Sequence, residues 1–202
     1  MREKIDCFLP CADIADLAET IGDLSASKTV QHIHLLTGDA TNINNIPQGV
    51  ELLETRHPLS TDAILQIAER TDAEYVLIST KPTPVRLGQH SLERFLRVAA
   101  DANAAMVYSD HYSVVEGTVV RHPVIDYQKG SVRDDFDFGQ LVLVNASLLH
   151  EYAATPPVHK YAHAGLYDLR LFLSRKGEIF HINEYLYTEE ELDNRKSGEK
   201  QF

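Results

Sequence analysis

The chain has 202 residues, which is enough for one domain with a single hydrophobic core, and its 44% hydrophobic and 24% charged residues are typical of globular proteins. Its formal net charge of -11 repels phosphate backbones, so the sequence argues against general nucleic-acid binding, although one pocket can still be neutral or basic. No run approaches the ~20 apolar residues that a membrane-spanning helix needs.

The two cysteines, Cys7 and Cys11, lie four positions apart near the start of the chain. We interpret them as reduced thiols in a cytoplasmic protein, because a metal site would need further ligands within reach in the sequence. The apolar stretch around them is interrupted by Asp6 and is too short for a secretory signal.

Short β-like runs alternate with helical patterns through the first 110 residues, as in an α/β sheet. Strands are predicted over residues 5–9, 33–36, 50–53, 75–78 and 105–108. Helices are predicted after the first, third and fourth of these strands, where Asp13, Ser60 and Ser91 can serve as N-caps.

The pattern changes in the second half of the chain. Glu116 and Gly117 separate two valine-rich runs and predict a hairpin. We expect strands over residues 141–144 and 178–182, a short helix capped by Ser147, and a helix over residues 167–176 ended by Gly177.

The last residues, 189–202, are highly charged and contain little apolar surface. We expect a mobile tail or a segment that docks on something absent from this chain, and therefore one domain over residues 1–188. The polar ending also suggests a longer parent protein with a further domain.

Sheets of this kind bind ligands at the carboxyl ends of their strands, where the strand order reverses. The residues that follow the predicted strands are therefore the first candidates for a site. They are Pro10, residues 37–39, residues 80–83 and Asp110.

Several motifs resemble the family 2 glycosyltransferases and occur in the family's order. Val-Tyr-Ser-Asp-His at 107–111 resembles the family's VYSDED segment, and Leu-Tyr-Asp-Leu-Arg-Leu at 166–171 resembles its eDYDLxLRl segment. Gly177 and residues 181–187 complete the second motif, and Phe-Leu-Pro at 8–10 resembles the opening IIIPVYN strand. The resemblance covers most of the chain. It implies a GT-A fold, which is a Rossmann-related mixed β-sheet with helices on both faces.

The resemblance also implies an activity: inverting transfer of a sugar from a nucleotide-diphosphate donor to a glycan or lipid-linked acceptor, as in polysaccharide biosynthesis. A lipid-linked acceptor would bring peripheral contact with a membrane. Asp168 matches the carboxylate that deprotonates the acceptor hydroxyl. The alternative is an exposed Asp in the first turn of a helix, favoured by the helix dipole. Tyr167 stands where the family has a neighbouring acid.

By the same resemblance, the predicted donor-binding residues are Pro10, Thr37, Asp39 and Lys81. Thr37 and Gly38 replace the paired Asp residues that end the family's second strand, with Asp39 just beyond.

The family's Asp-x-Asp metal motif, which holds Mg²⁺ or Mn²⁺, is replaced by Thr-Lys-Pro-Thr at residues 80–83. Because this segment has no carboxylate, we predict no divalent metal on it. Three explanations stay open: the metal is not used, Lys81 supplies the positive charge, or donor binding has been lost.

Asp110, His111 and Asp135 are predicted on the acceptor side. Asp110 and His111 end a strand at the cleft, and Asp135 belongs to an acidic loop whose carboxylates can bind sugar hydroxyls. For Asp110 and His111 a turn cap at the strand end is the simpler interpretation, and the other carboxylates of the acidic loop are interpreted as solvated. His159 and His163, in the loop before the last helix, are interpreted as surface histidines.

Two other functional classes compete with the enzyme. A non-catalytic glycosyltransferase-like domain, binding a glycan or a partner domain, is favoured by the missing carboxylate pair, whereas the segment around Asp168 favours catalysis. A sugar nucleotidyltransferase would need a Gly- and Arg-rich loop after the first strand, and residues 10–13 lack one.

Overall fold

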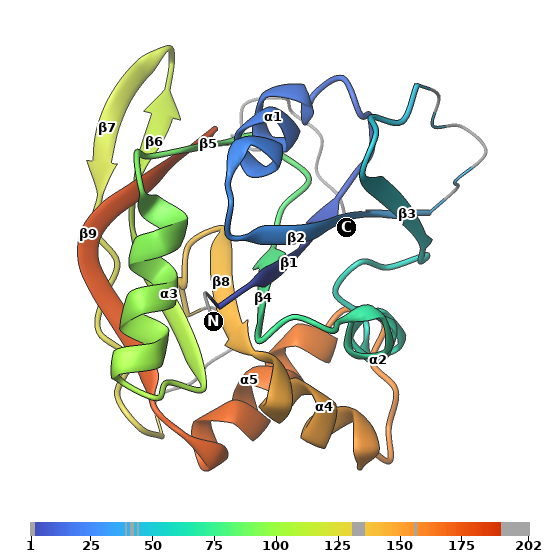
Figure 1. Ribbon diagram of the computed structural model, residues 1–202. Helices are drawn as coiled ribbons and strands as arrows, with labels where there is room; N and C mark the ends of the chain where they lie inside the picture. The colour runs from blue at the N-terminus through green and yellow to red at the C-terminus, as the bar shows by residue number, and fades with distance from the viewer. Residues whose placement is uncertain are drawn as a thin grey trace.

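The computed structural model describes residues 3–38, 40, 43, 45–130, 136–155 and 157–190. Within these residues the strands form one sheet in the order β3-β2-β1-β4-β8-β6-β9-β5, with β7 paired to β6 (Figure 1). The strands are β1 (Ile5–Pro10), β2 (Val30–Thr37), β3 (Val50–Glu54), β4 (Tyr75–Ser79), β5 (Val85–Leu87), β6 (Met106–Val115), β7 (Thr118–His122), β8 (Leu141–Asn145) and β9 (Ile179–Glu190). The helices are α1 (Ala18–Ala26), α2 (Thr61–Arg70), α3 (Ser91–Asp101), α4 (Ala146–Ala154) and α5 (Gly165–Lys176).

The first half of the sheet is parallel and the second half is mixed. Strands β3, β2, β1 and β4 run in the same direction, whereas β8 is antiparallel to both β4 and β6, and β9 is parallel to β6. The chain proceeds outward from β1 to β2 and β3, and then returns to place β4 on the other side of β1. The strand order therefore reverses between β1 and β4, which is where sheets of this kind bind ligands.

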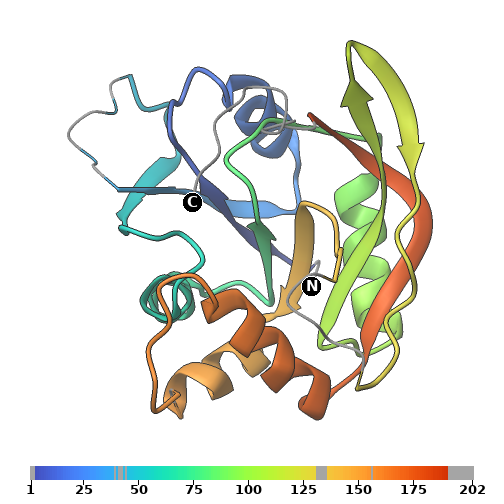
Figure 2. The ribbon, with the colours of Figure 1, turned by 180° about the vertical axis from the view of Figure 1, so that it is seen from behind.

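Helices cover both faces of the sheet, so the predicted fold class is confirmed. Helices α1 and α3 lie on one face, and α2, α4 and α5 lie on the other (Figures 1 and 2). Because side chains alternate along a strand, Cys7 and Leu9 of β1 join the core under α1 and α3, while Phe8 joins the other core. No helix in the described part of the chain combines the length and apolar character needed to cross a membrane.

The local signals for helix starts were correct at Ser60 and wrong elsewhere. The Ser60 hydroxyl accepts a hydrogen bond from Ala63 N at 3.1 Å and caps α2 as predicted. Asp13 instead accepts from Ala15 N at 2.9 Å, which forms a turn, and α1 begins only at Ala18.

Two other helix caps were also misplaced. Helix α3 follows His90, which has a left-handed backbone (φ 60°), so Ser91 is its first residue rather than its cap. Helix α4 is capped two residues earlier than predicted: the Asn145 side chain accepts from Leu148 N at 3.2 Å, and Ser147 lies inside the helix.

Two glycines in the second half of the chain, Gly117 and Gly177, lie where the sequence predicted a turn and a helix end. Glu116 and Gly117 both have positive φ, 51° and 77°, and join β6 to β7 by a two-residue hairpin turn. Gly177 ends α5 as predicted, but with an extended backbone rather than a left-handed one. A Cβ on Gly177 would lie 3.0 Å from Ala105 Cβ, so close packing explains the glycine.

The last strand is longer than the sequence indicated. Strand β9 has 12 residues, pairs with β6 and β5, and curves strongly across the sheet (Figure 1). Glu189 and Glu190, which were predicted to begin the tail, therefore belong to the sheet. The rest of the predicted tail, residues 191–202, lies outside the described residues.

The contact between α5 and α2 gives a test of the packing. A Cβ on Gly165 would overlap the backbone of Ser60 and Thr61, so Gly165→Ala should lower the free energy of unfolding by about 1–3 kcal/mol. Gly22 in α1 has no atom within 4 Å of such a Cβ, so Gly22→Ala should raise it by about 1 kcal/mol through helix propensity. Urea denaturation measures both changes. A shift of the same sign in the two variants would contradict the packing described here.

Candidate functional site

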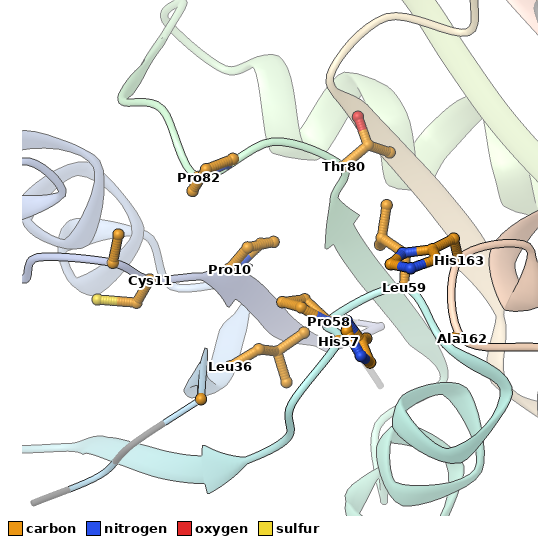
Figure 3. Close-up of a pocket in the computed structure, with 12 residues that line it drawn as sticks. Pro10, Cys11, Leu36, His57, Pro58, Leu59, Thr80, Pro82, Ala162 and His163 are labelled. Atoms are coloured by element: carbon orange, nitrogen blue, oxygen red, sulfur yellow. The ribbon is translucent and has the colours of Figure 1, made fainter. Parts of the chain in front are cut away.

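A cavity of about 390 Å³ lies at the carboxyl ends of β1, β2 and β4 (Figure 3). It therefore occupies the point where the strand order reverses, and its volume falls in the range of small-molecule sites. Most of its wall is apolar. The lining residues are Pro10, Cys11, Ala12, Leu36, Gly38, His57, Pro58, Leu59, Thr80, Pro82, Ala162 and His163.

Three prolines give the cavity rigid walls. Pro10 ends β1, Pro58 follows β3, and Pro82 lies in the turn after β4, so each comes from a different crossover (Figure 3). A proline fixes its own φ, which means that these walls lose little conformational entropy when a ligand binds. Cys11 N donates to the Leu36 carbonyl at 2.8 Å and holds the ends of β1 and β2 together.

The cysteines belong to the core and not to the chemistry. Cys7 and Cys11 are both free and buried. Burial, and then the nearby carboxylates of Asp13 and Asp16, raise the pKa of Cys11 above its ordinary value. The thiol at the cavity wall is therefore protonated and acts as an apolar surface.

Two histidines close the side of the cavity that faces α2. The rings of His57 and His163 meet edge to face, with centroids 4.7 Å apart. The loop that carries His163 is fixed to the start of α2, because Thr61 N donates to the Tyr161 carbonyl at 2.9 Å and Tyr161 N donates to the Thr61 hydroxyl at 3.0 Å. His57 was missed by the sequence analysis, which did not examine the residues after the third strand.

A second, more polar cavity of about 740 Å³ lies beside the first, and the two share Gly38, His57 and Ala162. Its wall includes Arg56 and Lys160, whose ammonium is 2.6 Å from an Asp62 carboxylate oxygen. The cleft thus has an apolar part over the sheet and a polar part at the start of α2.

The predicted donor residues fall in different places. Pro10 lines the apolar cavity, whereas Thr37 is buried between two cavity-lining neighbours, Leu36 and Gly38. Asp39 lies outside the described residues, as does Asp135 on the acceptor side.

Lys81 lies between the lining residues Thr80 and Pro82 in the chain, but its side chain extends toward β9. Its ammonium is 2.7 Å from Glu189 Oε1. The Glu189 side chain is only 4% exposed, and His111 Nε2 lies 3.3 Å from the same oxygen, outside hydrogen-bond geometry. Burial by itself would raise the pKa of Glu189, but the contacts with His111 and Lys81 outweigh burial and hold this pKa below its ordinary value.

The predicted acceptor-side residues Asp110 and His111 lie in two separate buried clusters. Asp110 Oδ1 accepts from Val124 N at 2.9 Å and lies 2.9 Å from His181 Nε2, so it fixes the segment after β7 to the sheet. His111 is stacked between the rings of His122 and Tyr187, at centroid distances of 4.5 and 5.2 Å.

Asp168 lies in the first turn of α5, as predicted, and its carboxylate faces α4. The Tyr152 hydroxyl donates to Asp168 Oδ2 at 2.8 Å. Arg170 lies over the Phe138 ring instead of pairing with Asp168. Burial, and then the contact with Asp168, raise the pKa of Tyr152 above its ordinary value. The described residues that line the apolar cavity do not include Asp168.

Comparisons with known proteins identify the fold. No protein-family model matches the sequence, and no curated protein is similar to it in sequence. A solved structure of S. aureus TarS, residues 1–349 in complex with UDP-GlcNAc, matches with a TM-score of 0.62 at 13% identity, over 98% of this chain and 62% of that one. The chain therefore shares its fold with this TarS fragment.

Two cytidylyl-transfer enzymes share this fold as well. The 4-diphosphocytidyl-2C-methyl-D-erythritol synthase of Anaerococcus prevotii matches with a TM-score of 0.54 at 12% identity, over 91% of this chain and 88% of that one. The bifunctional IspDF of Campylobacter jejuni matches with a TM-score of 0.52 at 11% identity, over 90% of this chain and 50% of that one. The chain thus spans about half of IspDF and three-fifths of the TarS fragment. At these identities the likeness shows the fold alone.

The buried Glu189 predicts a stability that depends on pH. Because its folded pKa is lowered, its contribution is fully present above about pH 4.5 and is lost as the pH falls through the folded pKa. Glu189→Gln should lower the free energy of unfolding by about 1–3 kcal/mol at about pH 7, and the difference from wild type should shrink at about pH 3.5. The control is Glu184→Gln, which alters an exposed pair with Arg94 and should cost under about 1 kcal/mol. Urea denaturation at both pH values is the measurement, and a difference that stays constant with pH would refute the assignment.

Proposed function

We propose that this domain binds a nucleotide-diphosphate sugar in the strand-end cavity and transfers the sugar, with inversion, to a glycan or lipid-linked acceptor, in the manner of a family 2 glycosyltransferase. The observation that supports this most is the position of the apolar cavity. It lies at the reversal point between β1 and β4, in a fold shared with TarS, whose solved structure holds UDP-GlcNAc.

The character of the cleft suits a nucleoside. A base and a ribose present flat, mostly apolar surface, which the walls from Pro10, Leu36 and Pro58 can cover. The polar cavity beside it offers Arg56 and Lys160 for hydroxyl or phosphate groups. Because the chain has a net charge of -11, it repels long polyanions, and only a small anionic ligand fits a local site of this kind.

Asp168 is the proposed general base. In the transfer step, the acceptor hydroxyl gives its proton to the carboxylate, the hydroxyl oxygen bonds to the anomeric carbon, and the bond from that carbon to the phosphate oxygen breaks. The nucleoside diphosphate leaves with the bonding electrons. The hydrogen bond from Tyr152 stabilises the charged carboxylate and so weakens the base, which means that Asp168 must be released from Tyr152 for catalysis.

A non-catalytic domain is the second candidate, and that same hydrogen bond favours it. If Tyr152 holds Asp168 in the interface of α4 and α5, Asp168 contributes to helix packing and has no role toward a sugar acceptor. Such a domain would bind a glycan or a partner domain and transfer nothing. Nucleotidyl transfer has less support, because residues 11–17, which follow β1, contain Asp13 and Asp16 and no Arg, Lys or Gly.

Blocking the cavity tests where the nucleotide binds. Ala12 is exposed at the cavity wall, so Ala12→Trp should fill the space of the nucleoside and weaken binding by at least about tenfold. Ala15→Trp, three residues further and also exposed, does not face the cavity and should bind normally. Calorimetry with UDP, GDP and CDP sugars measures this. If none of them binds the wild-type domain, the proposed function is wrong.

Replacing Asp168 separates the enzyme from the non-catalytic domain. Asp168→Asn keeps the shape and removes the proton acceptor, so the transfer rate should fall by about 10²–10⁴-fold. Tyr152→Phe removes the hydrogen bond but keeps the carboxylate, so its rate should be equal to wild type or higher. A wild-type rate in Asp168→Asn, or equal losses in the two variants, would remove Asp168 from the catalytic step.

A further inference from the structure

Several oxygen atoms of the turn after β4 are already hydrogen-bonded to the side chain of Gln140 or to one another. The buried side chain of Gln140 donates from Nε2 to the Ser79 hydroxyl and to the carbonyls of Lys81 and Thr83, at 3.1, 3.3 and 2.7 Å. The Thr83 hydroxyl donates to Gln140 Oε1 at 3.2 Å, and the Ser79 hydroxyl donates to the Lys81 carbonyl at 3.0 Å. These oxygens therefore face the interior and already have partners.

A divalent cation does not fit this turn. Mg²⁺ and Mn²⁺ prefer hard oxygen ligands, usually carboxylates, and residues 80–83 supply none. The carboxylate of Glu189 cannot serve a metal ion here freely, because the Lys81 ammonium already lies against it at 2.7 Å. A second cation at this place would be repelled by Lys81.

Lys81 puts a fixed positive charge at the end of β4. An ammonium group has three donors, and Glu189 Oε1 accepts one of them. The Lys81 side chain is 43% exposed, so it is accessible to a ligand from solvent. The buried Glu189 carboxylate holds the Lys81 ammonium in one position. It accepts only one of the three hydrogen bonds that this ammonium can donate.

The segment that carries this charge also bounds the apolar cavity. The apolar cavity is bounded by the ends of β1 and β4, and its wall includes both chain neighbours of Lys81. Beyond β4, the sheet continues through β8 and β6 to β9, which carries Glu189. A nucleoside in the cavity whose phosphates extend across the end of β4 therefore brings them to the ammonium.

We propose that the Lys81 ammonium, positioned by Glu189, binds the diphosphate of the donor, so that the nucleotide binds without a divalent metal. This inference rests on the proposed function, and it specifies which group at the same site binds the charged diphosphate of the donor. A lysine is a compact point charge that pairs well with phosphate, and a charge-assisted hydrogen bond of this kind changes affinity by about ten- to a hundredfold.

Calorimetry with nucleosides and their diphosphates tests the proposal. Uridine, UDP, cytidine and CDP are titrated into the wild-type chain in EDTA and again with Mn²⁺. We expect a diphosphate to bind equally well in both buffers. Lys81→Gln should weaken the diphosphate about ten- to a hundredfold and leave the matching nucleoside unchanged. The control is Lys176→Gln, because Lys176 is 41% exposed and pairs with Glu151 at 2.5 Å. Lys176 is the last residue of α5, whereas the cavity-lining residues Ala162 and His163 precede the start of that helix.

The outcomes distinguish this proposal from the proposed function. If a diphosphate binds only with Mn²⁺, or if Arg56→Gln weakens it while Lys81→Gln does not, Lys81 is not the phosphate ligand and nucleotide binding still stands. If neither nucleosides nor diphosphates bind, both proposals fail. The comparison of EDTA with Mn²⁺ uses the unmodified chain, so it decides the question even if Lys81→Gln does not fold. Lys81→Arg, which keeps the charge, should retain diphosphate binding within about tenfold.

Discussion

The buried amide of Gln140 is the constraint on which the cleft depends. Gln140 is fully buried where β8 begins, and its side chain satisfies the carbonyls of the turn after β4 while its backbone N–H donates to the Tyr187 hydroxyl of β9 at 2.8 Å. An unsatisfied polar group at this depth costs about 1–3 kcal/mol, so the turn is held in one conformation. One residue thus joins β4, β8 and β9 through its side chain and its backbone N–H, and Thr80 and Pro82 lie at the cavity wall with Lys81 directed toward β9.

Two of the buried carboxylates connect parts of the chain that are distant in sequence. Glu189 is ionised inside the sheet because Lys81 and His111 lie against it, and Asp110 is buried beside His181 and the Val124 amide. Both carboxylates fix segments that are distant in sequence. In contrast, the apolar cavity has no Lys or Arg among its described lining residues, so an anionic group of a bound ligand would need a cation from outside this wall.

The two interpretations of Asp168 differ in one contact. Its carboxylate is directed to Tyr152, and the loop that precedes α5 lines the cavity through Ala162 and His163. The hydrogen bond to Tyr152 suits the packing role, whereas a proton acceptor would need a carboxylate released from it. The fold is shared with enzymes that transfer sugars and with enzymes that transfer nucleotides, so the fold does not choose between the two chemistries.

The sequence by itself determined the α/β fold class and most of the order of elements, because periodicity and local signals such as Ser60 and Glu116-Gly117 act within a few residues. It gave no sign of the short strand β5, and the reversal of strand order between β1 and β4 came from the structure. It placed Asp13 wrongly as a helix cap, since a turn competes for the same short side chain. Only the tertiary structure decided that β9 extends through Glu189, and that Glu189 meets Lys81. That contact joins residues 108 positions apart, and sheet pairing across such a distance leaves no periodic trace near either residue.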